Sequence, residues 1–182
     1  MSSERLNPFS YAILVLVGRD GAGPHDLRRA AEIGRVFWVA APSQWYAEPK
    51  RLAELGYLEA RKEPGRTRER THYTLTGKGR EALAAWARTP AQLPRTQHET
   101  VVRLLAADLV GPEPVLEGLP GLKDDVEEAL ERLVGARAAW AGLEHRAPLL
   151  RVNDHYAERL LRLQLEWLDE AEQVLRSGEV GA

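Results

Sequence analysis

The stretch SQWYAEPKRLAELGYLEARKEPGRTRERTHYTLT, residues 43–76, decides the fold. It begins with the pattern of a helix, because Ser43 is a favourable N-cap and Gly56 supplies a stop one residue past the last helical position. Beyond the glycine the pattern changes to that of two strands, 57–63 and 71–76, separated by a turn. The sequence therefore predicts a helix that is followed directly by a β-hairpin.

The tip of this hairpin is strongly basic. Arg66, Arg68 and Arg70 alternate along the chain, so an extended ribbon would present three guanidinium groups on one side. Guanidinium groups bind phosphates well. A helix followed by a ribbon with a cationic tip is how a winged helix-turn-helix domain meets duplex DNA, with the helix in the major groove and the ribbon against the backbone. The alternative is a solvated hairpin whose arginines only keep an edge soluble.

The candidate DNA-contacting residues follow from this arrangement. The wing contributes its three arginines, and the predicted recognition helix contributes Ser43, Gln44, Tyr46, Lys50 and Arg51. We expect Lys50 and Arg51 to touch phosphates. Base reading would come from Gln44 or from Arg51, since an arginine can bind guanine bidentately.

The same residues resemble the PadR-type transcriptional regulators. The resemblance rests on the spacing of several short pieces, namely Tyr46, Lys50-Arg51-Leu52, Leu55-Gly56-Tyr57-Leu58, the basic wing, Tyr73-Thr74-Leu75-Thr76 and Lys78-Gly79. The resemblance extends over most of the first half of the chain. In the second half it is limited to the helical spacing of apolar residues, mainly leucines. It implies a winged helix that binds double-stranded DNA and dimers formed through long C-terminal helices. In some members of the family, small aromatic or cationic compounds release the repressor from DNA.

Pro49 departs from that pattern, because family members usually carry an ordinary helix former at this place. Proline removes one helical hydrogen bond and crowds the preceding turn. The recognition helix is therefore expected either to be kinked or to begin only near Glu48. The second case would take Ser43, Gln44 and Tyr46 out of the base-reading positions.

The composition is that of a soluble globular protein, with 44% hydrophobic and 29% charged residues among 182. The absence of cysteine excludes disulfides, thiolate chemistry and cysteine-ligated zinc. The start of the chain lacks the features of a signal peptide, and the longest apolar stretch, residues 11–17, is too short to span a bilayer. We therefore expect a cytoplasmic protein with no membrane partner.

Charge divides the chain into two halves. Residues 1–90 hold 15 Lys and Arg against 10 Asp and Glu, a net +5, whereas residues 91–182 hold 10 against 17, a net −7. A basic half favours a polyanion partner. With Pro90 and Pro94 at the boundary, the sequence predicts a winged helix-turn-helix DNA-binding domain over 1–90 and an α-helical dimerisation domain, with a possible effector site, over 91–182. The predicted fold class is mainly α with a small β-hairpin.

The second half is predicted to be helical over 96–110, 123–146 and 154–175. Pro148 is expected to break the chain before the last of these helices. Between the first two, residues 115–122 are interrupted by two glycines and a proline, so we expect a loop or a short broken helix there.

The last helix carries two apolar stripes, which a small helical hairpin cannot cover by itself. A homodimer would bury them. Burial within the chain, against the helix predicted over 96–110, is the alternative. The candidate dimerisation residues are Leu160, Leu163, Trp167, Leu168 and Val174.

No pattern indicates an enzyme, a metal site or a cofactor. The five histidines do not pair at ligand spacing, and neither a nucleophile elbow nor a dinucleotide fingerprint is present. Trp86, Trp140 and Trp167 could line a cavity that accepts a flat aromatic effector, although ordinary core tryptophans are the alternative.

The sequence therefore predicts a sequence-specific DNA-binding transcriptional regulator, in the form of a dimeric, ligand-responsive repressor. A helical ligand-binding or protein-interaction scaffold, whose winged helix contacts protein rather than DNA, is the alternative.

Overall fold

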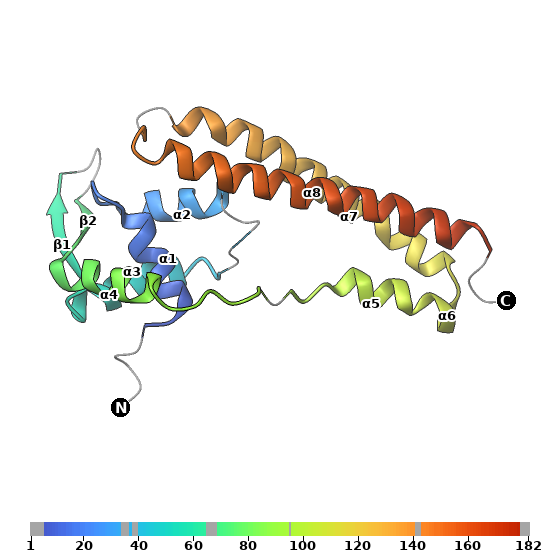
Figure 1. Cartoon of the computed structure of the whole chain (residues 1–182), viewed down its shortest axis with the longest axis horizontal. Helices are drawn as coiled ribbons and strands as arrows, with labels where there is room; N and C mark the ends of the chain where they lie inside the picture. The colour runs from blue at the N-terminus through green and yellow to red at the C-terminus, as the bar shows by residue number, and fades with distance from the viewer. Residues whose placement is uncertain are drawn as a thin grey trace. The chain divides into compact units, whose positions relative to one another are not determined.

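The chain divides by its internal contacts into two compact units, Met1–Leu93 and Pro94–Ala182, called unit 1 and unit 2 below (Figure 1). The computed structural model describes residues 6–33, 37, 40–64, 69–94, 96–140 and 143–178, without the side chains of residues 31–33, 139 and 140. The division into two units does not test the functions predicted for residues 1–90 and 91–182, which stay predictions.

Unit 1 contains a helical core and one antiparallel hairpin. In chain order its elements are α1 (Pro8–Val17), α2 (Pro24–Ile33), α3 (Gln44–Glu54), β1 (Leu58–Glu63), β2 (Arg70–Leu75) and α4 (Gly77–Ala87). The apolar side chains of these elements meet in a single cluster, which consists of Ile13, Leu14, Val17, Ala22, Leu27, Trp45, Leu52, Leu58 and Tyr73. Helix α1, which is apolar all round, supplies the centre of this cluster.

The hairpin is paired in register from Leu58 opposite Leu75 to Glu63 opposite Arg70. It is also joined to the turn between α1 and α2. The amide of Ala22 donates to the carbonyl of Tyr73 at 3.0 Å, and the amide of Tyr73 donates to the carbonyl of Ala22 at 3.0 Å. The base of the hairpin therefore belongs to the core of unit 1.

Helix α3 runs unbroken through Pro49, and the expectation that it begins only near Glu48 is wrong. The helix starts at Gln44, with Ser43 at the N-cap position but without a side-chain capping bond. Proline leaves one carbonyl of the first turn without its helical donor. Its ring is fully buried, however, and the apolar surface it removes from water offsets that loss.

The C-terminal end of α3 confirms the stop predicted at Gly56. This glycine has φ 78°, a left-handed conformation that suits glycine. The amide of Tyr57 donates to the carbonyl of Leu52 at 2.9 Å, and the amide of Gly56 donates to the carbonyl of Ala53 at 3.0 Å. These are the two bonds of a Schellman motif, which satisfies carbonyls that the helix end would otherwise leave open.

The start of α4 covers this helix end. The Lys78 ammonium donates to the carbonyl of Leu55 at 2.8 Å and lies 4.4 Å from the centre of the Tyr57 ring. The Thr76 hydroxyl donates to the carbonyl of Gly56 at 2.7 Å. A cation at the negative end of a helix dipole is stabilising, so Lys78 helps to hold the C-terminal end of α3 in place.

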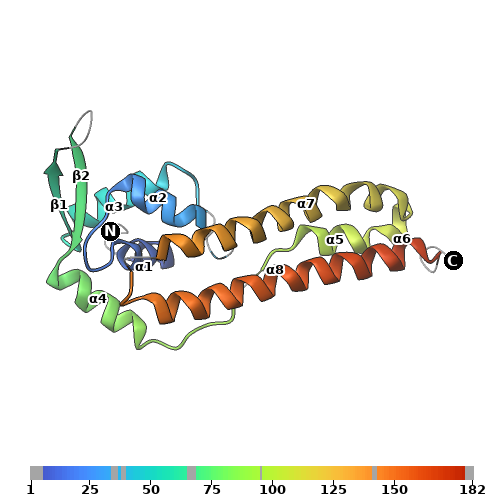
Figure 2. The ribbon, with the colours of Figure 1, turned by 90° about the horizontal axis from the view of Figure 1, so that it is seen from above.

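The described part of unit 2 consists of helices joined by short loops, with no strand. Its elements are α5 (Glu99–Leu105), α6 (Ala107–Val110), α7 (Glu113–Ala136), the 3₁₀ turn η1 (Arg137–Trp140) and α8 (Ala147–Arg176). Helices α7 and α8 lie antiparallel and side by side, as Figures 1 and 2 agree, and α5 and α6 pack near the C-terminal half of α8. A second core lies there, formed by Ala107, Val115, Leu119, Leu168 and Leu175.

Four helix boundaries in unit 2 differ from the predicted ones. The helix predicted to reach residue 146 ends at Ala136, where the 3₁₀ turn η1 begins. Residues 115–122 are part of α7 rather than a loop, because Val115 and Leu119 face the core while Pro120 is exposed on the other side. Proline does not break α8 either: Pro148 occupies its first turn, where no amide donor is needed, so α8 begins at Ala147. The helix predicted over 96–110 is divided into α5 and α6.

A polar network joins the end of α7 to the start of α8. Arg137 donates to Asp154 at 2.9 Å and to Glu158 at 2.6 Å, and Glu158 also accepts from Arg162 at 2.8 Å. The bonds from Arg162 and then from Arg137 hold the pKa of the Glu158 carboxyl below its usual range. Among the described residues, no helix is long and apolar enough to cross a membrane.

Candidate nucleic-acid interface

Helix α3 presents one face to solvent and another to the core. Trp45, Pro49 and Leu52 are its buried residues. The opposite face repeats at intervals of four, three and four residues, and its members are exposed: Ser43, Ala47, Lys50 and Glu54. These intervals place them on one line along the helix, so this line points away from unit 1 and is available to a partner.

The flank of α3 nearer α1 holds two of the predicted contact residues, Gln44 and Arg51, together with Glu48. Gln44 is exposed, and its side-chain oxygen accepts a bond from the Ala41 amide at 3.2 Å. Its side-chain nitrogen has no partner among the described residues and is free to contact a base. Gln44 is therefore accessible, and its role in reading a base edge stays a prediction.

Arg51 is bound within unit 1. Its Nε donates to one oxygen of Glu48 at 2.9 Å, and its Nη2 donates to the other oxygen at 2.6 Å. Burial alone would raise the pKa of the Glu48 carboxyl, but the hydrogen bonds from Arg51 and Ser10 outweigh it and leave the pKa below the usual value. The bond to Glu48 in turn raises the pKa of Arg51. The structure thus separates Arg51 from the other predicted contacts by giving it a strong partner.

Tyr46 and Lys50 are accessible. Tyr46 is 46% exposed. Lys50 lies 3.9 Å from Glu54, and both side chains are mostly exposed. An exposed pair of this kind contributes little to stability, so Lys50 can exchange Glu54 for a phosphate at low cost.

Two residues of the outward line were not among the sequence candidates, Ala47 and Glu54. Ala47 is small and apolar, and the methyl group of alanine suits the methyl group of thymine. Glu54 could accept a bond from cytosine but would repel a phosphate. Ala47 and Glu54 lie four and eleven residues after Ser43. This helical spacing places them on the same face as Ser43, so it could have identified them in the sequence.

The described part of the hairpin is balanced in charge. It carries three cations and three anions, namely Arg61, Lys62, Arg70, Glu59, Glu63 and Glu69. Arg70 pairs with the directly opposite Glu63 at 3.2 Å. Arg66 and Arg68 lie outside the described residues, and they are the cations that give the whole wing its positive excess.

A groove of about 580 Å³ lies between α3 and the hairpin. Its lining includes Lys50, Glu54, Glu59 and Tyr73. Burial, and then the charge of Glu54, raises the pKa of the Tyr73 hydroxyl. Two carboxylates against one ammonium make the interior of this groove unsuited to phosphate, although Lys50 and Glu54 at its edge also belong to the outward line of α3.

The candidate effector residues lie in separate surroundings. Trp86 of unit 1 stacks on Tyr11, with ring centres 4.7 Å apart and planes 7° from parallel. Trp167 of unit 2 meets the edge of His98 at 5.3 Å between ring centres. The side chain of Trp140 lies outside the described residues.

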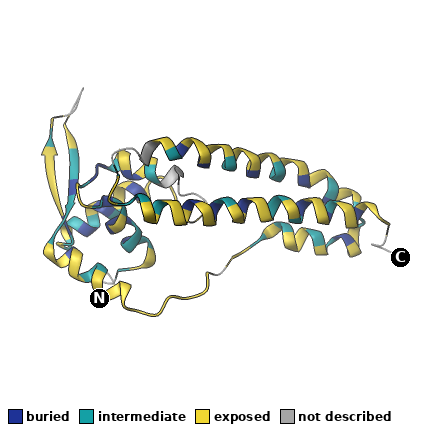
Figure 3. Ribbon diagram, turned by 45° about the horizontal axis from the view of Figure 1, so that its top comes forward, coloured by how far each residue is buried: buried dark blue, intermediate teal, exposed yellow. Residues whose placement is uncertain are grey.

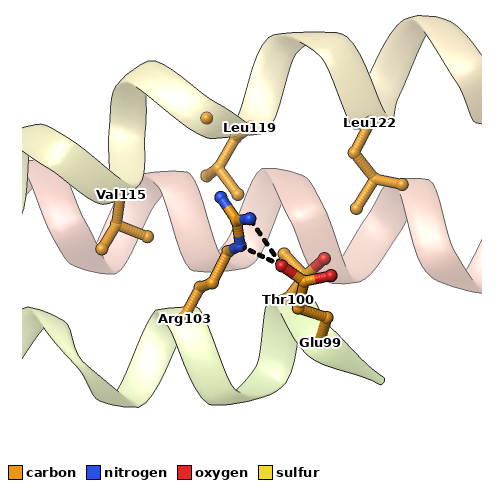
Figure 4. A pocket seen from close by; sticks show the side chains of 7 residues that line it. Glu99, Thr100, Arg103, Val115, Leu119 and Leu122 are labelled. Carbon is orange, nitrogen blue, oxygen red and sulfur yellow. Dashed lines mark hydrogen bonds and ion pairs between the residues drawn. The ribbon is translucent and has the colours of Figure 1, made fainter. Parts of the chain in front are cut away.

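A hollow of about 230 Å³ lies between α5 and α7 (Figure 4). Val115, Leu119 and Leu122 form its apolar wall, and Arg103 reaches across it while bound to Glu99 at 2.8 Å. The hollow is smaller than an ordinary ligand pocket, and neither Trp86 nor Trp167 lines it.

The predicted dimerisation residues fall into two groups. Leu168 is 2% exposed in the core of unit 2, and Trp167 packs against that core. Leu160, Leu163 and Val174 remain exposed, and exposed apolar residues Leu149 and Val152 continue the same face toward the start of α8. Figure 3 shows α8 with buried and exposed positions alternating along its whole length. Part of the apolar surface of α8 is thus covered within the chain, and part is not.

Solved structures with the same fold are known, although no protein-family model and no curated protein matches the chain. The Bacillus subtilis regulator PadR in complex with operator DNA is 20% identical, with a TM-score of 0.76 over 93% of this chain and 99% of that one. A PadR-like transcriptional regulator from Bacillus cereus is 14% identical, with a TM-score of 0.81 over 96% and 99%. Bacillus subtilis PadR in complex with p-coumaric acid is 20% identical, with a TM-score of 0.67 over 92% and 98%.

These likenesses extend over nearly the whole of each chain. At such identities they show the fold, which is a winged helix-turn-helix followed by a helical C-terminal region. The fold class predicted from the sequence is confirmed. Helix α3 occupies the place of the recognition helix in this fold, and β1 and β2 form its wing.

Proposed function

We propose that the chain is a PadR-like transcriptional regulator that binds a specific duplex DNA site as a homodimer. The observation that carries the proposal is the likeness, over 93% of the chain, to a regulator whose structure contains operator DNA. The residues of this chain support it independently, because the outward line of α3 is polar or small and the wing sequence is basic.

In the proposed complex α3 enters the major groove. Ser43, Gln44 and Tyr46 lie near its N-terminal end, and Lys50 lies one turn further on. The wing arginines Arg66, Arg68 and Arg70 would track the phosphates beside the groove. The net charge of +5 over residues 1–90 supports this orientation.

The homodimer is supported by the uncovered apolar residues of α8. Leu160, Leu163 and Val174 are 39%, 60% and 42% exposed. Contiguous apolar surface of this kind marks an interaction site in soluble proteins. Pairing through α8 in a two-fold dimer would hold two copies of α3 at a fixed spacing, as two half-sites of DNA require.

A ligand response is the finer part of the proposal. One solved neighbour contains p-coumaric acid, a small aromatic acid. In this chain the half-exposed Trp86 and the partly buried Trp167 are the aromatic groups on which such a ligand could stack. We propose repression released by a small aromatic effector, in a protein that has no enzymatic role and works in the cytoplasm.

Fluorescence anisotropy tests the proposal. The full chain is titrated onto a labelled fragment from upstream of its own coding region, and onto a scrambled duplex of the same length, over a series of salt concentrations. We expect the native chain to prefer the upstream fragment, with an affinity that falls steeply as salt rises. Replacing Arg66, Arg68 and Arg70 by alanine should weaken binding to both duplexes and reduce the salt slope by about one unit for each arginine that binds a phosphate in the native complex.

The alternative of a protein-contact scaffold would be supported if a folded dimer bound neither duplex at low salt. An α3 interrupted at Pro49 would favour this alternative, because an interrupted recognition helix could not read DNA. Helix α3 is continuous from Gln44 to Glu54, so no observation in the structure favours the scaffold.

A further inference from the structure

Three side chains of unit 1 form a polar cluster that the proposed DNA contacts leave unexplained. Ser10 on α1 is fully buried, and the side chains of Glu48 and Arg51 on α3 are 13% and 30% exposed. The Ser10 hydroxyl lies 2.6 Å from one Glu48 oxygen and 3.1 Å from Nη2 of Arg51. The cluster therefore links the recognition helix to α1 at a point beside the DNA-facing surface.

The bonds in this cluster are charge-assisted and two-pronged. Arg51 reaches both oxygens of Glu48, at 2.9 Å and 2.6 Å. A bidentate pair between guanidinium and carboxylate holds the planar group in a fixed orientation. Ser10 is held in turn by Asn7, whose side chain accepts from the Ser10 amide at 2.9 Å in the capping box of α1.

Lys50 on the same helix is held differently. Its ammonium lies 3.9 Å from Glu54, and the two side chains are 76% and 65% exposed. Of these two neighbouring cations, one faces solvent with a loose partner, and the other lies against α1 with both carboxylate oxygens engaged. Only the first can move to a phosphate without leaving a partly buried carboxylate unpaired, which is costly.

We propose that Glu48 is a positioning residue that determines specificity: it binds Arg51 against α1 and keeps this guanidinium off the DNA. Base reading is then left to Gln44 and to the outward line, where the short side chains of Ser43 and Ala47 allow the helix backbone to approach the groove closely. The inference rests on the proposed function. It predicts that a released Arg51 would bind phosphate on any sequence, since such contacts carry no sequence information.

The experiment compares Glu48→Gln with the native chain on the upstream fragment and on the scrambled duplex. Glutamine keeps the shape of the side chain but removes the charge that holds Arg51. We expect binding to the scrambled duplex to strengthen, and the salt slope to steepen by about one unit for each protomer whose Arg51 binds a phosphate. The ratio of affinities for the two duplexes should fall by roughly tenfold.

Two further variants separate Arg51 from the charge of Glu48. In the Glu48→Gln, Arg51→Gln double variant, the salt slope and the affinity ratio should return to the native values, because no guanidinium is released. Glu81→Gln on α4 removes a carboxylate from an exposed position of unit 1 and should change neither quantity. Circular dichroism confirms that each variant is folded before it is titrated.

Two results would overturn the inference. If Glu48→Gln lowers only the melting temperature and keeps the native slope and ratio, the cluster is structural. If the double variant has a salt slope about one unit shallower per protomer than the native chain, Arg51 contacts DNA in the native complex.

A measurement on the native chain covers the case in which Glu48→Gln does not fold. The NMR resonance of the Arg51 Nε–Hε group should stay in place when the upstream fragment is added, because its bond to Glu48 persists. A resonance that shifts in step with DNA binding would overturn the inference. Absence of specific binding by the native chain would instead count against the proposed function, so the two failures can be distinguished.

Discussion

Helices α3 and α8 each leave one face exposed, but they differ in what that face carries. The outward line of α3 is small or charged, with Ser43 and Lys50 among its members. The open face of α8 carries large apolar side chains, such as Leu149 and Leu163, each more than half exposed. Water hydrates the polar groups of the α3 face favourably, whereas its contact with the apolar face of α8 is unfavourable. An exposed helix face thus indicates its partner by its chemistry: a hydrated polar ligand for α3 and a second apolar surface for α8.

The two helices also differ in how their positions are held. Helix α3 is tied to α1 through Glu48 and Ser10 and to α4 through Lys78. Both ties are hydrogen bonds to groups of the same unit, so unit 1 holds α3 in position without a partner chain. Helices α5, α6 and α7 cover only one face of α8, and the apolar side chains on the other face are exposed.

Leu52→Ala should cause the largest loss of stability. Leu52 is fully buried between α3 and the rest of unit 1, and removing a buried leucine side chain costs about 3 kcal/mol. Hydrogen exchange measured by mass spectrometry should show the loss in peptides of α1 and α3. The matched change Leu163→Ala, at a residue 60% exposed on α8, should cost less than about 0.5 kcal/mol in the monomer. Equal losses of unfolding free energy in the two variants would mean that Leu163 of α8 is held by its own chain as firmly as Leu52 of α3.

Gly79→Ala should come next. A Cβ atom at Gly79 would lie 2.3 Å from the carbonyl oxygen of Tyr57, where the start of α4 closes over the end of α3. Relieving that overlap requires the backbone to shift, at a cost of about 2 kcal/mol. Gly77 is the matched control, since a Cβ there meets nothing within 4 Å. Thermal unfolding should show a lower melting temperature for Gly79→Ala only.

The signals that located α3 and the hairpin in the sequence are local ones. Gly56 ends the helix because a left-handed residue is required there, and Thr76 begins α4 because its hydroxyl accepts the Gly79 amide at 3.0 Å. Such signals act over a few residues and can be read directly from the sequence. The hairpin strands were predicted to within one residue for the same reason.

The features that the sequence could not supply depend on distant contacts. Pro120 is tolerated in α7 because it faces solvent while Leu119 faces the core, and this follows only from how α7 packs. The link of Arg51 and Glu48 to α1 runs through Ser10, which is 41 residues from Arg51, so helical spacing alone could not predict it. The separation of Leu168 from Leu163, one in the core and one exposed, likewise depends on where α5 and α6 lie.

Leu163→Glu tests the partner of α8. The change places a charge on the exposed apolar face and should weaken the proposed homodimer by at least about tenfold, which is about 1.4 kcal/mol. The fold of the monomer should be unaffected, because the side chain is not part of the core of unit 2. Sedimentation equilibrium over a range of concentrations measures the effect. Gln173→Glu adds the same charge at an exposed position off this face, so a similar weakening there would contradict the proposed interface.

Lys78→Met should have a smaller effect on unit 1. It removes the bond of 2.8 Å to the Leu55 carbonyl and the interaction with the Tyr57 ring. A charged cap at a helix C-terminus contributes about 1 kcal/mol. Urea unfolding should show this loss, whereas Lys78→Arg, which keeps a cation in place, should recover most of it. Full stability in Lys78→Met would mean that the Schellman bonds alone hold the end of α3.

The smallest expected effect is a dependence of unit 1 stability on pH through Glu48. Its carboxyl has a pKa below the usual value because bonds from Arg51 and Ser10 outweigh the opposing effect of burial. A carboxyl whose pKa is lowered by folding stabilises the native state above its unfolded pKa, and this contribution is lost as the pH falls through the folded pKa. Other carboxyls titrate in the same acidic range, so the quantity to measure is the difference in unfolding free energy between the native chain and Glu48→Gln. That difference should be constant near neutral pH and should shrink as the solution is acidified. A difference that stays the same throughout the acidic range would mean that the Glu48 carboxylate does not stabilise the link between α3 and α1.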